Sequence, residues 1–128
     1  MCSSRWIDHV KNTKEQYGVQ EITADELQAA LQEKDTAPVL IDVRETDEWK
    51  TGKLPTAVGL PRGILELKVE NVVSPDSQRP IVLYCAGGLR SIMTAASLIG
   101  MGYNKENIKS LTGGFGSWAK KGYTVVKD

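Results

Sequence analysis

Two short apolar runs, residues 38–43 (PVLIDV) and 81–85 (IVLYC), constrain the fold more than any other feature of this chain. Neither run alternates apolar with polar residues, so neither fits a strand that has one face in water. Continuous apolar runs of this length are typical of strands buried on both faces, which occur in parallel sheets covered by helices. The rest of the chain is therefore expected to supply helices for both sides of a sheet.

The segments around these two runs show that alternation of short strands and helices. Further strands are predicted at 19–22, 57–60 and 108–111. Helices are predicted at 3–17, from the Thr23–Glu26 capping box to about Lys34, and at 45–52, 63–70, 90–101 and 114–122. This order predicts an α/β domain with a mainly parallel sheet flanked by helices.

The length of 128 residues suits one compact domain. We expect residues 1–18 to form a helical extension packed on a domain that spans residues 19–128. The apolar side of that helix, with Trp6 and Val10, would dock on the core; a subunit contact is the alternative. The sequence leaves open whether the protein is a monomer or a homodimer.

The charge balance argues against two classes of partner. Sixteen basic residues match sixteen acidic ones, so the net charge is zero. A neutral chain is not expected to bind nucleic acid or an anionic membrane as its main partner. No segment approaches the ~18 apolar residues of a membrane span, and the first residues lack the apolar core of a signal peptide. These features predict a cytoplasmic protein.

The chain has two cysteines, Cys2 and Cys85, and one histidine, His9. This set is too small for a disulfide framework or a structural zinc site. We therefore expect a free Cys85 in a reducing compartment. Cys2 is expected to be a surface thiol, for which a resolving role stays open.

Residues 85–91 (CAGGLRS) contain the strongest candidates for catalytic and binding residues. A thiol at the carboxyl end of a strand lies where parallel sheets bind ligands. The loop amides and the start of the next helix favour an anion there, and Arg90 would add a cation. The predicted binding groups are Ala86, Gly87, Gly88, Leu89 and Ser91, with Ser91 also a candidate helix cap. A cysteine that ends a buried strand is otherwise a packing residue.

The nucleophile predicted at Cys85 has no obvious general base. His9 lies in the predicted N-terminal helix, far along the chain, and is expected to be solvated rather than paired with the thiol. Activation would come from the loop amides and Arg90. This arrangement suits transfer of an already nucleophilic sulfur better than peptide hydrolysis.

With these features, the sequence resembles a rhodanese, a sulfurtransferase domain. The loop resembles the family pattern at Cys85-x-x-Gly88-x-Arg90-Ser91. Residues 41–61 (IDVRETDEWKTGKLPTAVGLP) resemble D-V-R-E-x-x-E-[YW]-x-x-G-H-I-P-G-A, and residues 111–123 (LTGGFGSWAKKGY) resemble L-x-G-G-x-x-x-W. Order and spacing agree over residues 19–126. The resemblance implies a three-layer, five-stranded parallel domain in which Cys85 carries sulfur without a metal or organic cofactor.

The resemblance also assigns supporting residues. Asp42 matches the family aspartate, which we interpret as structural, and Arg44 and Glu45 are expected to form an ion pair that fixes the loop. Trp49 and Trp118 match aromatic positions that should pack in the core.

One position departs from the family pattern. Lys53 replaces the usual histidine, which should leave the fold intact and could change the charge near the cleft. Some relatives that use thiosulfate add a second cation beside the loop. Arg62 is the candidate for that role, provided that its segment approaches the loop.

The loop length bears on the reaction. Four residues separate Cys85 from Arg90, whereas the related phosphatases and arsenate reductases have five and a wider cradle. We therefore expect a sulfurtransferase that moves a sulfane sulfur from thiosulfate or a persulfide to cyanide or a thiol. A phosphatase or arsenate reductase is a weaker alternative. A carrier or regulatory module that exchanges sulfur with a protein partner stays open.

Overall fold

The computed structural model describes residues 4–127, and the alternation of strands and helices is confirmed. Short 3-10 helices are written η. In chain order the elements are α1 (Ser4–Tyr17), β1 (Gln20–Ile22), α2 (Ala24–Gln32), β2 (Val39–Asp42), η1 (Thr46–Thr51), β3 (Val58–Gly59), η2 (Arg62–Ile64), α3 (Leu65–Lys68), η3 (Val69–Asn71), β4 (Ile81–Tyr84), α4 (Arg90–Gly100), η4 (Lys105–Asn107), β5 (Ile108–Leu111) and α5 (Gly114–Lys120).

The five strands form one parallel sheet in the order β1-β5-β4-β2-β3. The two strands predicted from apolar runs, β2 and β4, are neighbours in its centre and are buried along their whole length. Their register pairs Asp42 with Tyr84, so both strands end at the same edge of the sheet. Cys85 follows directly at that edge.

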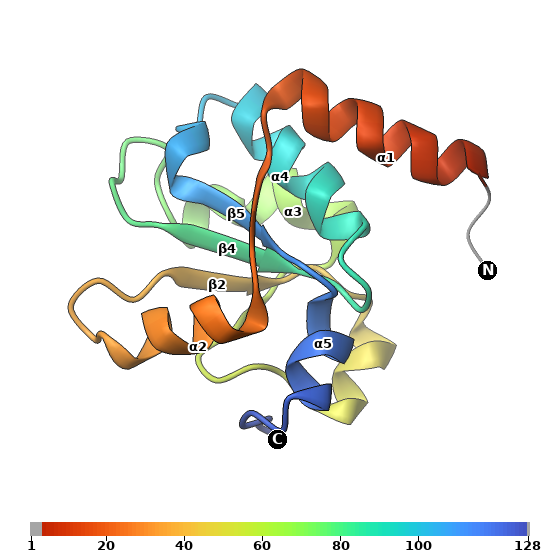
Figure 1. Cartoon of the computed structure of the whole chain (residues 1–128). Helices are drawn as coiled ribbons and strands as arrows, with labels where there is room; N and C mark the ends of the chain where they lie inside the picture. The colour runs from red at the N-terminus through yellow and green to blue at the C-terminus, as the bar shows by residue number, and fades with distance from the viewer. Residues whose placement is uncertain (1–3, 128) are drawn as a thin grey trace.

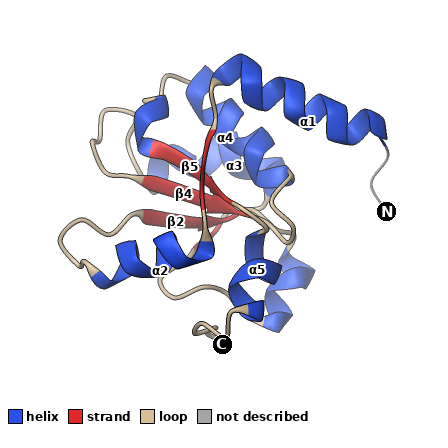
Figure 2. Cartoon of the chain, viewed as in Figure 1, coloured by secondary structure: helices blue, strands red, loops and turns tan. Residues whose placement is uncertain are grey.

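Helices cover both faces of the sheet, which gives the three layers expected (Figure 1, Figure 2). One core cluster contains Val10, Leu83 and Ile92 and lies under α1, α3 and α4. The other contains Leu27 and Trp118 and lies under α2 and α5. Alternate residues of the central strands β2 and β4 enter opposite clusters because successive side chains of a strand point to opposite faces.

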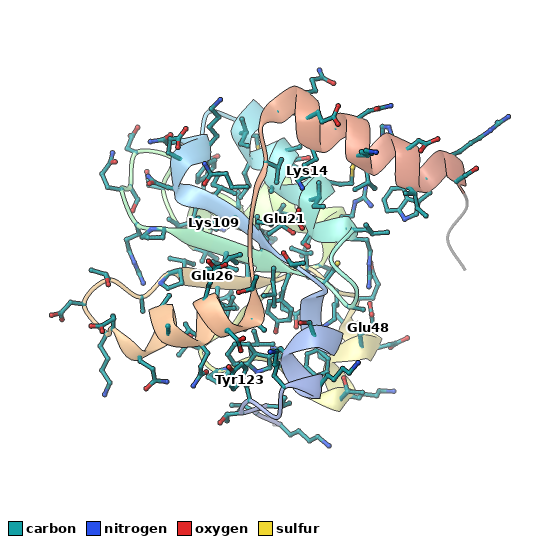
Figure 3. The ribbon with its side chains drawn as sticks, in the orientation of Figure 1. Lys14, Glu21, Glu26, Glu48, Lys109 and Tyr123 are labelled. Atoms are coloured by element: carbon teal, nitrogen blue, oxygen red, sulfur yellow. The ribbon has the colours of Figure 1, made fainter. Side chains whose placement is uncertain are left out.

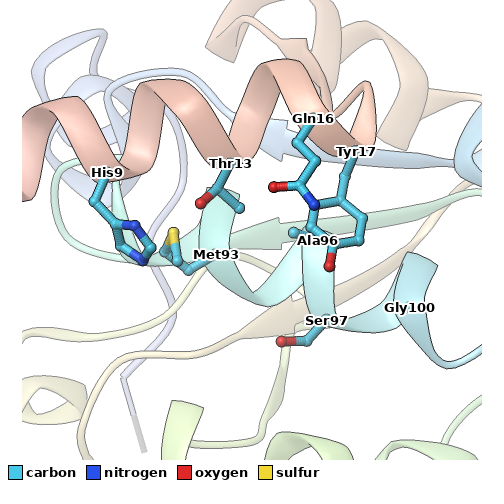
Figure 4. Close-up of a pocket in the computed structure, with 8 residues that line it drawn as sticks. All are labelled: His9, Thr13, Gln16, Tyr17, Met93, Ala96, Ser97 and Gly100. Carbon is cyan, nitrogen blue, oxygen red and sulfur yellow. The ribbon is translucent and has the colours of Figure 1, made fainter.

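The N-terminal helix α1 packs along α4 (Figure 1). Val10 is buried in the interface, and Lys14 forms an ion pair with Glu21 of β1 (Figure 3). The two helices leave a cavity of about 310 Å³ whose lining includes the exposed side chain of His9 (Figure 4). The division of the chain at residue 18 stays a prediction, and Cys2 lies outside the described residues.

Several predicted elements differ in detail from the observed ones. The helix expected over 63–70 is broken into η2, α3 and η3, of which the buried Leu65 and Val69 anchor one side in the core. The turns expected at 45–52 are the 3-10 helix η1, and α2 ends at Gln32 rather than near Lys34. Within residues 4–127, none of the helices has the length and apolar composition needed to cross a bilayer.

Candidate active site

Cys85 lies at the base of a cleft, directly after β4, and only 1% of its surface is exposed. Its side chain points to the α4 face of the sheet, like those of Ile81 and Leu83. The Gly88 N–H donates to the sulfur at 3.1 Å, and the Ser91 hydroxyl lies 3.5 Å from it. The predicted anion-binding loop therefore directs at least one amide at the sulfur, as backbone N–H groups do in anion-binding loops.

The second glycine motif of the sequence, residues 111–116, packs against the backbone of this loop and forms hydrogen bonds with it. The Phe115 N–H donates to the Cys85 carbonyl at 2.8 Å, and the Gly116 N–H donates to the Ala86 carbonyl at 3.1 Å. A Cβ on Gly114 would lie 2.3 Å from the Cys85 carbonyl oxygen, so only glycine allows this approach. The glycines at the start of α5 thus hold the backbone of the cysteine loop in place.

Ser91 does not cap α4, contrary to prediction. The helix begins at Arg90 after Leu89, and no side chain caps it. The buried Ser91 hydroxyl instead bonds the Ser110 hydroxyl of β5 at 2.7 Å, beside the Cys85 sulfur. The reason is position: Ser91 lies inside the first turn, where its side chain points back toward the sheet.

Arg90 lines the cleft, but its charge is engaged by Glu48. Two guanidinium nitrogens of Arg90 donate to the two Glu48 carboxylate oxygens at 2.9 and 3.0 Å. This hydrogen bonding raises the pKa of Arg90 and lowers the pKa of Glu48 from their ordinary values. Glu48 lies on η1 (Figure 3), where the Glu45 N–H also donates to its carboxylate.

Sequence reasoning missed Glu48, although a signal was present. Glu48 occupies the second glutamate of the D-V-R-E-x-x-E pattern, which marks it as a residue with a position-specific role. Its partner Arg90 lies 42 residues away, so spacing along the chain could not show the pair.

The expected ion pair between Arg44 and Glu45 is wrong. Arg44 pairs with Asp42, through Nη2 at 2.7 Å and Nε at 3.0 and 3.1 Å, and both residues are buried. Residues two apart in extended backbone share a face, whereas the adjacent Glu45 points away into solvent. The structural role predicted for Asp42 fits this geometry.

Arg44 ties several segments together behind the cleft. Its guanidinium also donates to the Gly52 carbonyl at 2.6 Å and lies 4.3 Å from the ring centroid of Phe115. Burial acts to lower the pKa of Arg44, but the hydrogen bonds and charge of Asp42 outweigh it and raise the pKa. This pair lies on the α5 side of the sheet and does not line the cleft.

The cleft has a volume of about 620 Å³ and is formed by residues from three parts of the chain. It is lined by Trp6, Arg62, Cys85, Gly87, Leu89 and Arg90. The segment that contains Arg62 reaches the Cys85 loop, as a second cation beside the loop requires. Ala86 and Glu45 are exposed nearby without lining this cleft.

The predictions for Trp118, Trp49 and Lys53 have different outcomes. Trp118 is fully buried in the core, as predicted. Trp49 is only half-buried, because it lies on η1 at the sheet edge, against Gly59. Lys53 lies with its amine 4.3 Å from the Trp49 ring centroid and pairs its backbone with Val126, so it does not line the cleft.

The geometry has little in common with a metal centre or a Cys–His site. Within residues 4–127, no three His, Cys, Asp or Glu side chains are grouped as a metal site would require. His9 lines the cavity between α1 and α4 rather than the Cys85 cleft.

Fold and site together define a class of protein: a parallel α/β domain with a buried cysteine in an amide-lined loop between a central strand and a helix. Comparison with known proteins agrees. Residues 23–121 match the rhodanese-like domain, and the chain belongs to that family.

Its relatives include named sulfurtransferases. The chain is 30% identical over 108 residues to a sulfurtransferase of Allochromatium vinosum, covering 84% of this chain and 95% of the relative. It is 29% identical to the mitochondrial thiosulfate sulfurtransferase RDL2 of Saccharomyces cerevisiae, with 82% and 76% covered. These relatives support sulfurtransferase activity in general terms.

Two solved structures extend the comparison. A thiosulfate sulfurtransferase of Pseudomonas aeruginosa superposes with a TM-score of 0.80 at 26% identity, over 93% of this chain and 22% of that longer one. A protein of Rhodopseudomonas palustris, described as a possible tyrosine phosphatase, superposes with a TM-score of 0.78 at 27% identity, over 91% and 93%. The fold is therefore shared with a named thiosulfate sulfurtransferase and with a protein of unknown function described as a possible tyrosine phosphatase.

Proposed function

We propose that this protein is a sulfurtransferase that works through a persulfide on Cys85. The observation that carries the proposal is the Cys85 sulfur at the base of a cleft, with the Gly88 N–H 3.1 Å away. A donated hydrogen bond of this kind stabilises negative charge on sulfur, both in the thiolate and in the persulfide. The sulfurtransferase names of the relatives support the same reaction class.

The proposed cycle has two steps. The Cys85 thiolate attacks the outer sulfur of a donor; with thiosulfate, the S–S bond breaks and sulfite leaves with the bonding electrons. Cys85 then carries a persulfide anion. An acceptor, which is cyanide in vitro or a thiol in the cell, attacks the outer sulfur. With cyanide, thiocyanate leaves and the Cys85 thiolate is restored.

The residues around Cys85 would have different roles in this cycle. The Gly88 amide would hold charge on sulfur, with the other loop amides contributing as the persulfide extends into the cleft. Arg90 would contribute positive charge at the cleft wall, in a position held by Glu48. Asp42 and Arg44 would keep the ends of the central strands rigid from the opposite face of the sheet.

The alternative of a phosphatase or arsenate reductase is weaker on two grounds. Four residues separate Cys85 from Arg90, one fewer than the wider cradle that those enzymes use. In addition, Glu48 occupies the two Arg90 nitrogens that a bidentate oxyanion would need. A carrier that takes sulfur only from a protein partner uses the same Cys85 and differs in its donor.

The test is intact-protein mass spectrometry after thiosulfate or organic persulfide, followed by cyanide. We expect a gain of one sulfur atom on Cys85, removed by cyanide, and no hydrolysis of an aryl phosphate. The matched control is Cys85→Ser, which should fold normally because the change is small, yet gain no sulfur. Sulfur transfer by Cys85→Ser at the wild-type rate would refute the mechanism. Loading only from a protein donor would favour the carrier.

A further inference from the structure

Two residues of the Cys85 cleft, Trp6 and Arg62, have no part in the cycle described above. We propose that they make the cleft selective for organic persulfides that carry a carboxylate, in preference to inorganic thiosulfate. This inference rests on the proposed function, since it concerns the donor used by the same cysteine.

The size of the cleft is the first argument. Its volume is about 620 Å³, within the range of roughly 300–1,000 Å³ typical of pockets for small organic ligands. Thiosulfate is one small tetrahedral anion and would fill only part of it. A persulfide with an organic body of several bonds would bring its sulfur to Cys85 and still contact the outer walls.

The second argument is the chemistry of those walls. Trp6 comes from α1 and is half-buried, with its ring against the core cluster that contains Cys85. Leu89, in the loop itself, adds a second apolar surface. A flat aromatic wall beside a thiol makes no favourable contact with thiosulfate, which is a small, strongly hydrated dianion. The same wall can bury the apolar part of an organic donor.

The third argument is where the available positive charge lies. Arg90 uses two nitrogens on Glu48, but Arg62 forms no ion pair with a carboxylate anywhere within residues 4–127. The Arg62 guanidinium carbon lies 5.8 Å from the centroid of the Trp6 ring, so the cation and the aromatic wall adjoin. A guanidinium binds a carboxylate with two parallel hydrogen bonds, a match that depends on its planar fork.

The transfer step balances without an added oxidant or reductant. The Cys85 thiolate attacks the outer sulfur of R–S–SH, and a new S–S bond forms on Cys85. The S–S bond of the donor breaks, and R–S⁻ leaves with the bonding electrons. Arg62 would hold a carboxylate of R, and Trp6 would contact its apolar part.

The test compares three donors: glutathione persulfide, which carries carboxylates, the persulfide of 2-mercaptoethanol, which does not, and thiosulfate. The readout is the rate of sulfur gain on Cys85 in wild type, Trp6→Ala and Arg62→Gln. The matched controls are Tyr17→Ala, an aromatic residue of α1 that lines the cavity of Figure 4, and Arg79→Gln, an exposed arginine before β4.

We expect Arg62→Gln to slow loading from glutathione persulfide about tenfold, as for loss of a charged hydrogen-bonded pair, and to leave loading from the persulfide of 2-mercaptoethanol, which lacks a carboxylate, unchanged. Trp6→Ala should slow glutathione persulfide about fivefold and thiosulfate less than about twofold. Both control variants should match wild type with every donor.

Three results would overturn the proposal. The first is wild-type loading by both cleft variants. The second is an equal loss with all donors, which would indicate general damage to the cleft rather than selectivity. The third is faster loading of the wild-type protein by thiosulfate than by glutathione persulfide. A wild-type protein that gains no sulfur from any donor would instead overturn the proposed function itself.

Discussion

Replacing Gly114 by alanine tests the contact that holds the cysteine loop. Gly114 is the first residue of α5 and has a φ of +56°, a conformation that residues with an L side chain rarely adopt. Its α-carbon faces the backbone of the loop. An added Cβ would lie 2.3 Å from the Cys85 carbonyl oxygen and 2.8 Å from the Ala86 carbonyl group.

The expected cost has two parts. A left-handed conformation costs an L-residue roughly 1–2 kcal/mol. Forcing a methyl group into a packed site costs roughly 1–3 kcal/mol, and the neighbour here is backbone, which cannot rotate away. We therefore expect Gly114→Ala to lower the free energy of unfolding by roughly 2–5 kcal/mol. This is a large share of the roughly 5–15 kcal/mol typical of a domain.

The assay is urea unfolding followed by tryptophan fluorescence and circular dichroism, together with the rate of sulfur gain on Cys85. The loop should shift as well, because relief of the clash moves the Cys85 carbonyl away from the Phe115 N–H. Sulfur gain should therefore fall even at temperatures where the variant is folded. The matched control is Gly100→Ala at the end of α4, where an added Cβ meets nothing within 4 Å. A Gly114→Ala variant as stable and as active as the control would refute the reasoning.

Two further predictions concern the ion pairs. Asp42→Asn should lower the free energy of unfolding by roughly 3–5 kcal/mol, because it leaves the buried Arg44 charge uncompensated. Asp25→Asn, at an exposed ion pair, should change the urea midpoint much less; equal urea midpoints for the two variants would contradict this. The hydrogen bond from Arg90 lowers the pKa of Glu48 below its ordinary 4.5, so the pair stabilises the fold above that pH and is lost as the pH falls through the lowered value. The difference in urea midpoint between wild type and Glu48→Gln should thus stay constant from pH 7 to about 5 and shrink below 4.5; a difference that persists to pH 3 would contradict it.

Local signals in the sequence were enough for the framework of the fold. The apolar runs at 38–43 and 81–85 predicted strands buried on both faces, and these are the central neighbours β2 and β4. The Thr23–Glu26 capping box predicted the start of α2, and both of its reciprocal hydrogen bonds are present. Such features depend on residues a few positions apart, which a linear reading can see.

The position of Cys85 at the end of a buried strand was also determined by the sequence alone, because the strand and the glycines after it are contiguous. Its chemical surroundings were not. The partner of Arg90 is Glu48, and the walls of the cleft come from Trp6 and Arg62, residues brought together from distant parts of the chain.

The physical reason is that a parallel sheet gathers the carboxyl ends of its strands, and the loops that follow them, at one edge. Sequence patterns indicate which residues reach that edge, but side-chain direction and packing decide which of them meet. Arg44 illustrates the limit: it pairs with Asp42, on the same face of the extended backbone, rather than with its neighbour Glu45. The sequence alone determined the strands and the place of Cys85 at the end of one of them, and only the tertiary structure decided the ion pairs and the shape of the cleft.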